Sequence, residues 1–239
     1  GIPPFLIGLD RGTPWKLLCG LSETPLGMVT LKDNLNDLSD FSSNDRIALP
    51  QPGSIQHILL SMAAERQLGD PRLFDNQLIS MAHPEGMTAM LSGRNISAHF
   101  TSPPFLSKEL DEPNAKLVLS GQDAFQGRFT FIIGVAGPDW RNSPKSEELQ
   151  NSFMFALEEA IALAEQIKVA AITDDFTEQE IQEAVAELSE YYNQESSQLL
   201  SQLKVPGIIY STEVYGMEKF IQAMNRFGYV DEKRVRNNF

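Results

Sequence analysis

The sequence has very little cysteine, no long apolar run and few basic residues. Its single cysteine, Cys19, excludes an intrachain disulfide, and within an apolar run it is typical of a small buried hydrophobe. No window reaches the roughly 18 apolar residues of a transmembrane helix, so we expect no membrane insertion by this chain. Its 19 Lys and Arg against 32 Asp and Glu give a net charge of −13, which argues against nucleic acid and anionic membranes as partners.

Motifs of catalysis and metal binding are also missing. We find no G-x-S-x-G elbow, no P-loop, no G-x-G-x-x-G after a strand and no H-E-x-x-H. The three histidines, His57, His83 and His99, have no metal-site spacing, and His99 is typical of a hydrogen-bonded histidine in the interior or on the lobe surface. We therefore predict no metal and no cofactor, and binding is favoured over catalysis without catalysis being excluded.

What the sequence does contain is a regular alternation of strand and helix. Residues 46–49 predict a buried strand, and residues 54–68 predict an amphipathic helix that Gly69 ends. The pattern continues with strands at 77–81, 96–100 and 116–120 and with helices at 87–92 and 103–110. Such alternation predicts a parallel, doubly wound sheet.

Outside this region we expect a short helix at 4–10 and strands at 15–21, 26–31 and 129–135. From Pro138 onward the pattern becomes helical, with helices predicted at 144–168, 177–203 and 212–228. Their many glutamates are typical of a solvated helix face rather than of a metal site.

Three strand-to-helix turns, at residues 50–55, 82–87 and 100–104, carry the candidate ligand contacts. Ligands of parallel sheets bind at the carboxyl ends of the strands, beside helix N-termini with unpaired N–H groups. The candidates in these turns are Gly53, Ser54, Ile55, His83, Thr101 and Ser102. N-capping alone explains Ser54, Thr101 and Ser102 about equally well.

Five segments resemble the solute-binding proteins of ABC importers, and in particular the nitrate, taurine and alkanesulfonate group with its thiamine-pyrimidine-binding relatives. They are GIPPFLIG (1–8), ALPQPGSIQHILLSMA (48–63), HPEGMTAMLSGRNISAHFTSPPF (83–105), FTFIIGV (129–135) and YSTEVYG (210–216). The resemblance rests on order and spacing along nearly the whole chain, and none of the segments is a catalytic signature.

The resemblance implies a two-lobed α/β fold of the type II periplasmic-binding-protein kind, each lobe being a doubly wound, mainly parallel sheet. Lobe one would comprise residues 1–27 and 127–239, lobe two residues 28–126, and two hinge crossings would lie near 22–30 and 127–137. Family members begin with further strands and helices, so we expect a processed or partial chain with an incomplete lobe one. The resemblance also places Ile2 and Pro3 at the first-lobe cleft edge, and Ser22 and Glu23 near a crossing. Glu23 would suit the ammonium group of an amino-sulfonate, but we expect it simply to be exposed.

The implied function is capture of a small polar or anionic ligand by hinge closure. Its partners would be the ligand and the membrane subunits of the importer, in the periplasm or outside the cell and attached to the membrane. The resemblance does not single out nitrate, a sulfonate, taurine or a pyrimidine precursor as the ligand. The alternatives are an enzyme or biosynthetic relative on the same fold, acting on a small heteroaromatic substrate, and the sensor domain of a receptor.

Overall fold

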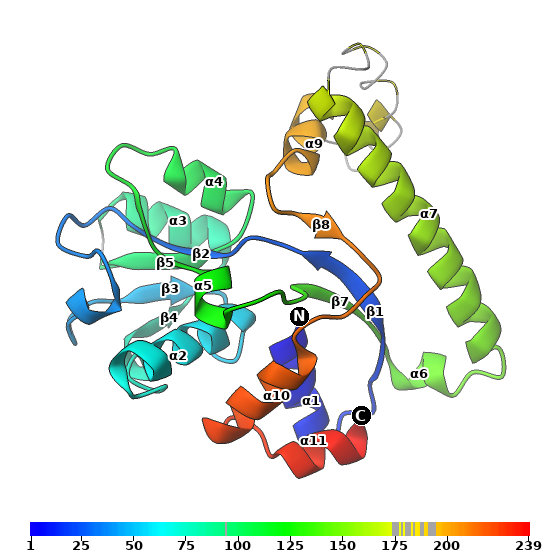
Figure 1. Cartoon of the computed structure of the whole chain (residues 1–239), viewed down its shortest axis with the longest axis horizontal. Helices are drawn as coiled ribbons and strands as arrows, with labels where there is room; N and C mark the ends of the chain where they lie inside the picture. The colour runs from blue at the N-terminus through cyan, green and yellow to red at the C-terminus, as the bar shows by residue number, and fades with distance from the viewer. Residues whose placement is uncertain are drawn as a thin grey trace.

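A computed structural model shows an α/β protein built on two sheets (Figure 1). The structure describes residues 1–93, 95–173 and 195–239, together with the isolated positions 177, 179, 183, 185, 186, 189 and 190. Arg94 and eleven residues of the helix predicted at 177–203 lie outside the described residues. Its last part is a separate helix, α9 (Ser196–Leu203), because Glu195 before it has an extended backbone, so a single helix up to Leu203 is wrong.

The larger sheet has five strands in the order β4-β3-β5-β2-β6. Its strands are β2 (Gly27–Thr30), β3 (Ile47–Leu49), β4 (Leu78–Ser80), β5 (Ala98–Thr101) and β6 (Lys116–Ser120). β3 runs parallel to β4 and β5, whereas β2 runs antiparallel to both β5 and β6. β5 and β6 therefore point the same way, so the predicted parallel set is confirmed, with one antiparallel strand inserted into it.

The helices of this sheet are α2 (Ile55–Leu68), α3 (His83–Leu91), α4 (Phe105–Leu110) and α5 (Gly121–Phe125), with short 3-10 turns at Leu38–Asp40 and Asp75–Gln77. α2 begins after Ser54 and ends at Gly69, as predicted. α3 begins at His83, four residues before its predicted start. The reason is Pro84, whose ring fixes the backbone angle that a first helical turn needs.

The smaller sheet has the order β7-β1-β8, with β1 at Lys16–Glu23, β7 at Ile132–Ala136 and β8 at Ile209–Tyr210. Both of its pairings are antiparallel, so the expectation of a mainly parallel sheet in each lobe is wrong for this one. The chain leaves toward the larger sheet along β1 and returns along β7. Strands that run out and back beside one another pair antiparallel.

Around the smaller sheet lie α1 (Ile2–Asp10), α6 (Pro138–Arg141), α7 (Ser146–Thr173), α10 (Met217–Arg226) and α11 (Glu232–Asn238). Figure 1 shows α7 along the outer side of β1 and β8, away from the five-stranded sheet. The last predicted helix, 212–228, begins only at Met217, because Gly216 before it adopts a left-handed conformation with φ of 84°. None of the described helices is long and apolar enough to cross a bilayer.

One apolar core joins helices from both sheets. It includes Leu6 and Leu9 of α1, Ile58 of α2 and Phe220 of α10, all fully buried. α1 packs directly against α2, α10 and α11. The position of the smaller sheet relative to the larger one therefore depends on helix packing as well as on the chain crossings.

Truncating one side chain tests how much this core contributes to the free energy of unfolding. Leu6→Ala leaves a cavity at a site with no exposed surface, and we expect it to lower the free energy of unfolding by about 2–5 kcal/mol. Leu163→Ala, on α7 at a leucine that is 52% exposed, is the matched control and should change stability by less than about 0.5 kcal/mol. Urea denaturation measures both, and equal losses would contradict the assigned core.

Candidate functional site

The three predicted turns lie along one edge of the five-stranded sheet. Because β3, β4 and β5 are parallel, their carboxyl ends share that edge, and α2 and α3 start from it. We call this edge, residues 50–56, 81–85 and 101–104, the rim. Side chains connect its parts: Thr101 Oγ1 lies 3.3 Å from His83 Nδ1, and Gln56 Nε2 lies 3.4 Å from His83 Nε2.

The start of α2 is capped and still has free donors. Ser54 Oγ accepts a hydrogen bond from the His57 N–H at 3.4 Å, so its capping role is real. Gly53 turns the chain with φ of 84° and donates its N–H to His57 Nδ1 at 2.9 Å. The N–H groups of Ile55 and Gln56 have no hydrogen-bond partner among the described residues. They remain available to a ligand acceptor.

The start of α3 is more open. No side chain caps it, and the N–H groups of His83 and Glu85 also lack a partner in the part of the chain that the structure describes. Two helix N-termini with unpaired donors therefore face the same edge. Their partial positive charges favour an anion or a polarised oxygen there.

A hydrogen-bonded chain leads from the rim into the interior. His83 Nδ1 lies 3.1 Å from His99 Nε2, and His99 Nδ1 lies 2.6 Å from Glu109 Oε1. The Gln56 amide can only donate to His83, so His83 donates from Nδ1 to His99, which in turn donates to the Glu109 carboxylate. Each imidazole is thereby fixed in one tautomer.

Burial makes the hydrogen-bonded series from His83 to Glu109 poorly suited to act as a general base. His99 and Glu109 have fully buried side chains, and Glu109 Oε2 has no partner among the described residues. Burial, and then the neighbouring His99, lower the pKa of His83 to about 4. At neutral pH His83 is therefore uncharged and a weak general base.

Sequence reasoning missed Gln56 and Glu109. Of the two positions predicted for His99, the interior one is correct, and its partner could have been found on the next helix. Glu109 lies three residues after the buried Leu106, which places a carboxylate on the inward face of α4. A histidine on the preceding strand is the natural partner for such a group.

The structure places the other candidates away from the rim or beneath its surface. Ile2 and Pro3 belong to α1 rather than to a loop, and both are buried. Ser22 lies in β1, opposite Tyr210, with its hydroxyl 3.3 Å from that of Thr24. At the rim, Ser54, Ile55, Thr101 and Ser102 are all at most 6% exposed, which leaves Gly53 and His83 as the partly exposed members of the predicted set.

Glu23, which we expected to be exposed, is 9% exposed and is held by Arg128. Arg128 Nε donates to Glu23 Oε2 at 3.0 Å and Arg128 Nη2 donates to Glu23 Oε1, so the ion pair is bidentate. Arg128 also lies over the Tyr215 ring, 3.9 Å from its centre. Neither charge is thus free for a ligand, and the idea that Glu23 holds an ammonium group loses its support.

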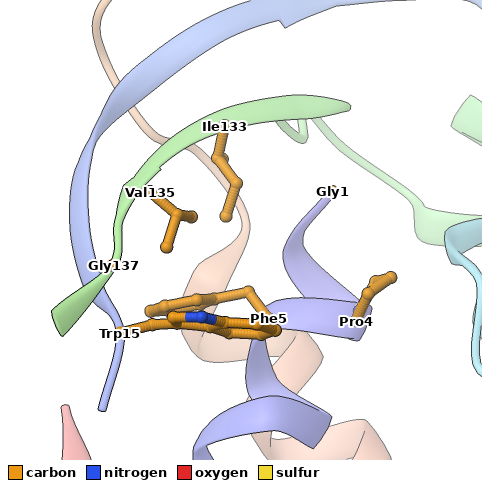
Figure 2. A pocket seen from close by; sticks show the side chains of 7 residues that line it. All are labelled: Gly1, Pro4, Phe5, Trp15, Ile133, Val135 and Gly137. Atoms are coloured by element: carbon orange, nitrogen blue, oxygen red, sulfur yellow. The ribbon is translucent and has the colours of Figure 1, made fainter. Parts of the chain in front are cut away.

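Three hollows differ in chemistry. One of about 320 Å³ lies between β7 and α1, where Ile133 and Val135 point toward the stacked rings of Trp15 and Phe5 (Figure 2). One of about 430 Å³, lined by residues such as Leu106, Leu117 and Val205, is also mainly apolar. The third, of about 420 Å³, adjoins Gly53 and carries charged side chains.

Solved structures share this fold along the whole chain. The periplasmic aliphatic sulphonate binding protein SsuA from Escherichia coli is 17% identical, with a TM-score of 0.62 over 100% of this chain and 77% of its own. The alkanesulfonate-binding protein SsuA from Xanthomonas axonopodis pv. citri, bound to MOPS, is 17% identical, with a TM-score of 0.64 over 98% and 74%. A ligand-binding component of an ABC-type import system from Staphylococcus aureus is 15% identical, with a TM-score of 0.59 over 100% and 79%.

No family model matches the chain, and no curated protein matches it. At these identities the structural likeness establishes the fold, that of periplasmic binding proteins. The neighbours named above are binding proteins, two for sulfonates and one for an ABC-type import system.

The buried histidine predicts a pH dependence. The pKa of His83 is lowered from its ordinary value of 6.5 to about 4, so between these pH values the unfolded chain binds more protons than the folded one. The free energy of unfolding should therefore fall as pH drops through this window. The loss should stay below the roughly 1.4 kcal/mol per pKa unit of a fully buried group, because solvent screens part of the ring.

His83→Gln removes this titration and keeps a polar side chain at the start of α3. Urea denaturation at pH 6.5 and at pH 4 should show a smaller loss of stability for the variant than for the wild type. Parallel losses in both proteins would mean that His83 titrates normally.

Proposed function

We propose that this protein is the solute-binding component of an ABC importer and that it captures a small polar or anionic ligand at the rim. The observation that carries the proposal is the meeting of two helix starts with unpaired N–H groups at one sheet edge, beside the partly exposed His83. The fold shared with sulfonate-binding and import-system proteins supports it.

The mechanism would be hinge closure between two lobes, residues 1–27 with 127–239 and residues 28–126. The two sheets support this division, because the smaller lies within the first proposed lobe and the larger within the second, apart from Gly27 at the start of β2. The chain passes between them near β1 and β7. A ligand that contacts both lobes would favour the closed form through its differential affinity. The membrane subunits of the importer would recognise the closed form and so distinguish the ligand-bound protein from the free protein.

The ligand contacts would be the unpaired backbone N–H group of Ile55 together with His83. Gly53 and Ser54 would shape the turn before them, and Thr101 at the end of β5 and Ser102 after it would support them. This set suits nitrate, a sulfonate, an amino-sulfonate such as taurine, or a pyrimidine precursor. Ile2, Pro3 and Ser22 would have to contribute through the facing lobe. The protein would work in the periplasm or outside the cell, and no cofactor would take part.

A matched pair of charge variants tests the rim. His83→Glu places a carboxylate beside the unpaired N–H groups, and we expect it to weaken binding of an anion such as nitrate, methanesulfonate or taurine by about tenfold or more, about 1.4 kcal/mol. Thr88→Glu adds the same charge at an exposed position further along α3 and should change affinity by less than about twofold.

Thermal-shift screening of the wild type identifies the compound, and isothermal titration calorimetry measures the variants. The proposal is wrong if none of these anions nor a pyrimidine precursor binds. It is also wrong if both glutamate variants lose the same affinity, because a charge at the rim would then affect anion binding no more than a charge elsewhere on α3.

A further inference from the structure

The hollow of about 420 Å³ beside Gly53, which we call the side hollow, carries charged side chains that the rim does not use. It is bounded by Ile7, Asp10 and Arg11 at the end of α1, by residues around the start of α2, and by Asp75, Leu78 and Tyr229. Its walls therefore come from three parts of the chain that are far apart in sequence. The rim histidine His83 does not line it.

Asp75 provides a fixed negative charge in this hollow. Its Oδ1 accepts from His57 Nε2 at 3.0 Å and from the Tyr229 hydroxyl at 3.1 Å. His57 can serve as that donor because its Nδ1 already accepts the Gly53 N–H. Two donors thus hold one carboxylate oxygen, whereas Oδ2 has no hydrogen bond among the described residues and the side chain is 33% exposed.

Tyr229 remains a donor under all ordinary conditions. Burial first of all, with a contribution from the charge of Asp75, raises the pKa of Tyr229 to about 12. Its hydroxyl also lies 3.1 Å from Ser61 Oγ, and the Arg72 guanidinium lies 4.9 Å from its ring centre. The tyrosine therefore fixes the orientation of Asp75.

Arg11 provides the opposite charge. It is exposed at the end of α1, and within the described part of the chain it forms no ion pair. Its neighbour Asp10, on which the charge of Arg11 also acts, is already paired, since Arg234 donates to both of its carboxylate oxygens at 2.9 and 3.2 Å. The unpaired charges around the side hollow are therefore one cation and one anion, with apolar Ile7 and Leu78 also in its wall.

We propose that the side hollow binds a small zwitterion of the amino-acid type, with its ammonium group on Asp75 Oδ2 and its carboxylate on Arg11. Opposite charges at the two ends of the ligand match the two unpaired charges of the protein. A ligand with a single charge would leave either Asp75 or Arg11 without a partner, and it should bind more weakly. The side hollow shares Pro52 and Gly53 with the rim but not His83, so the two sites can be altered separately.

Calorimetric titration with glycine, β-alanine and γ-aminobutyrate tests the proposal, because these zwitterions differ only in the separation of their charges. Methylammonium and acetate carry the same groups singly. At least one zwitterion should bind the wild type, about tenfold or more tightly than either single ion.

Asp75→Asn is the decisive variant. It keeps an oxygen that can accept from His57 and Tyr229 and removes the charge, so it should weaken zwitterion binding by about tenfold. It should leave anion binding at the rim unchanged, whereas His83→Glu should do the reverse. Arg11→Gln, at an exposed side chain, gives a second test that does not depend on the stability of the Asp75 variant.

The proposal is overturned if none of the three zwitterions binds, or if methylammonium binds as tightly as they do. Unchanged zwitterion affinity in both Asp75→Asn and Arg11→Gln would overturn it as well. Because the rim is measured separately with its own anions, failure here is distinguishable from failure of the proposed function.

Discussion

The packing of α1 against α2 is the constraint on which the rest of the structure depends. Ile2 and Leu6 of α1 share one buried core with Ile55 and Ile58 of α2. The approach is so close that a Cβ at Gly53 would lie 2.7 Å from Ile7 Cδ1, at a residue whose φ of 84° already favours glycine. This contact fixes the turn before α2, and with it the free N–H groups at the rim and one wall of the side hollow.

The rim and the side hollow are organised by neighbouring residues of α2. Gln56 points toward α3 and begins the chain through His83 and His99 to Glu109, whereas His57 bonds to Gly53 and Asp75. His99 donates to Glu109 and His57 donates to Asp75, and these bonds fix the tautomers of the two histidines. One helical turn therefore supports an uncharged binding edge on one side and a charged hollow on the other, and α2 has to stay rigid for both.

The strand and helix order of residues 46–121 could be predicted from the sequence, because apolar periodicity and capping residues such as Ser54 and Gly69 are local signals. The insertion of β2 between β5 and β6, and the antiparallel smaller sheet, could not be predicted, because strand pairing is decided by distant contacts. At the candidate site, the turns with Gly53 and His83 were predicted. Asp75 and Tyr229 were not, since they meet only through the fold, far apart along the chain, and Glu109 was missed although its partner His99 is ten residues before it.

Hydrogen exchange of the rim amides shows whether a ligand binds at the unpaired N–H groups of the rim. The N–H groups of Ile55, Gln56, His83 and Glu85 have no partner among the described residues, so they should exchange quickly in the free protein. When a small anion binds, exchange should slow at these four amides more than anywhere along α7. Binding that leaves all four unchanged would contradict the account, because the ligand would then lie elsewhere.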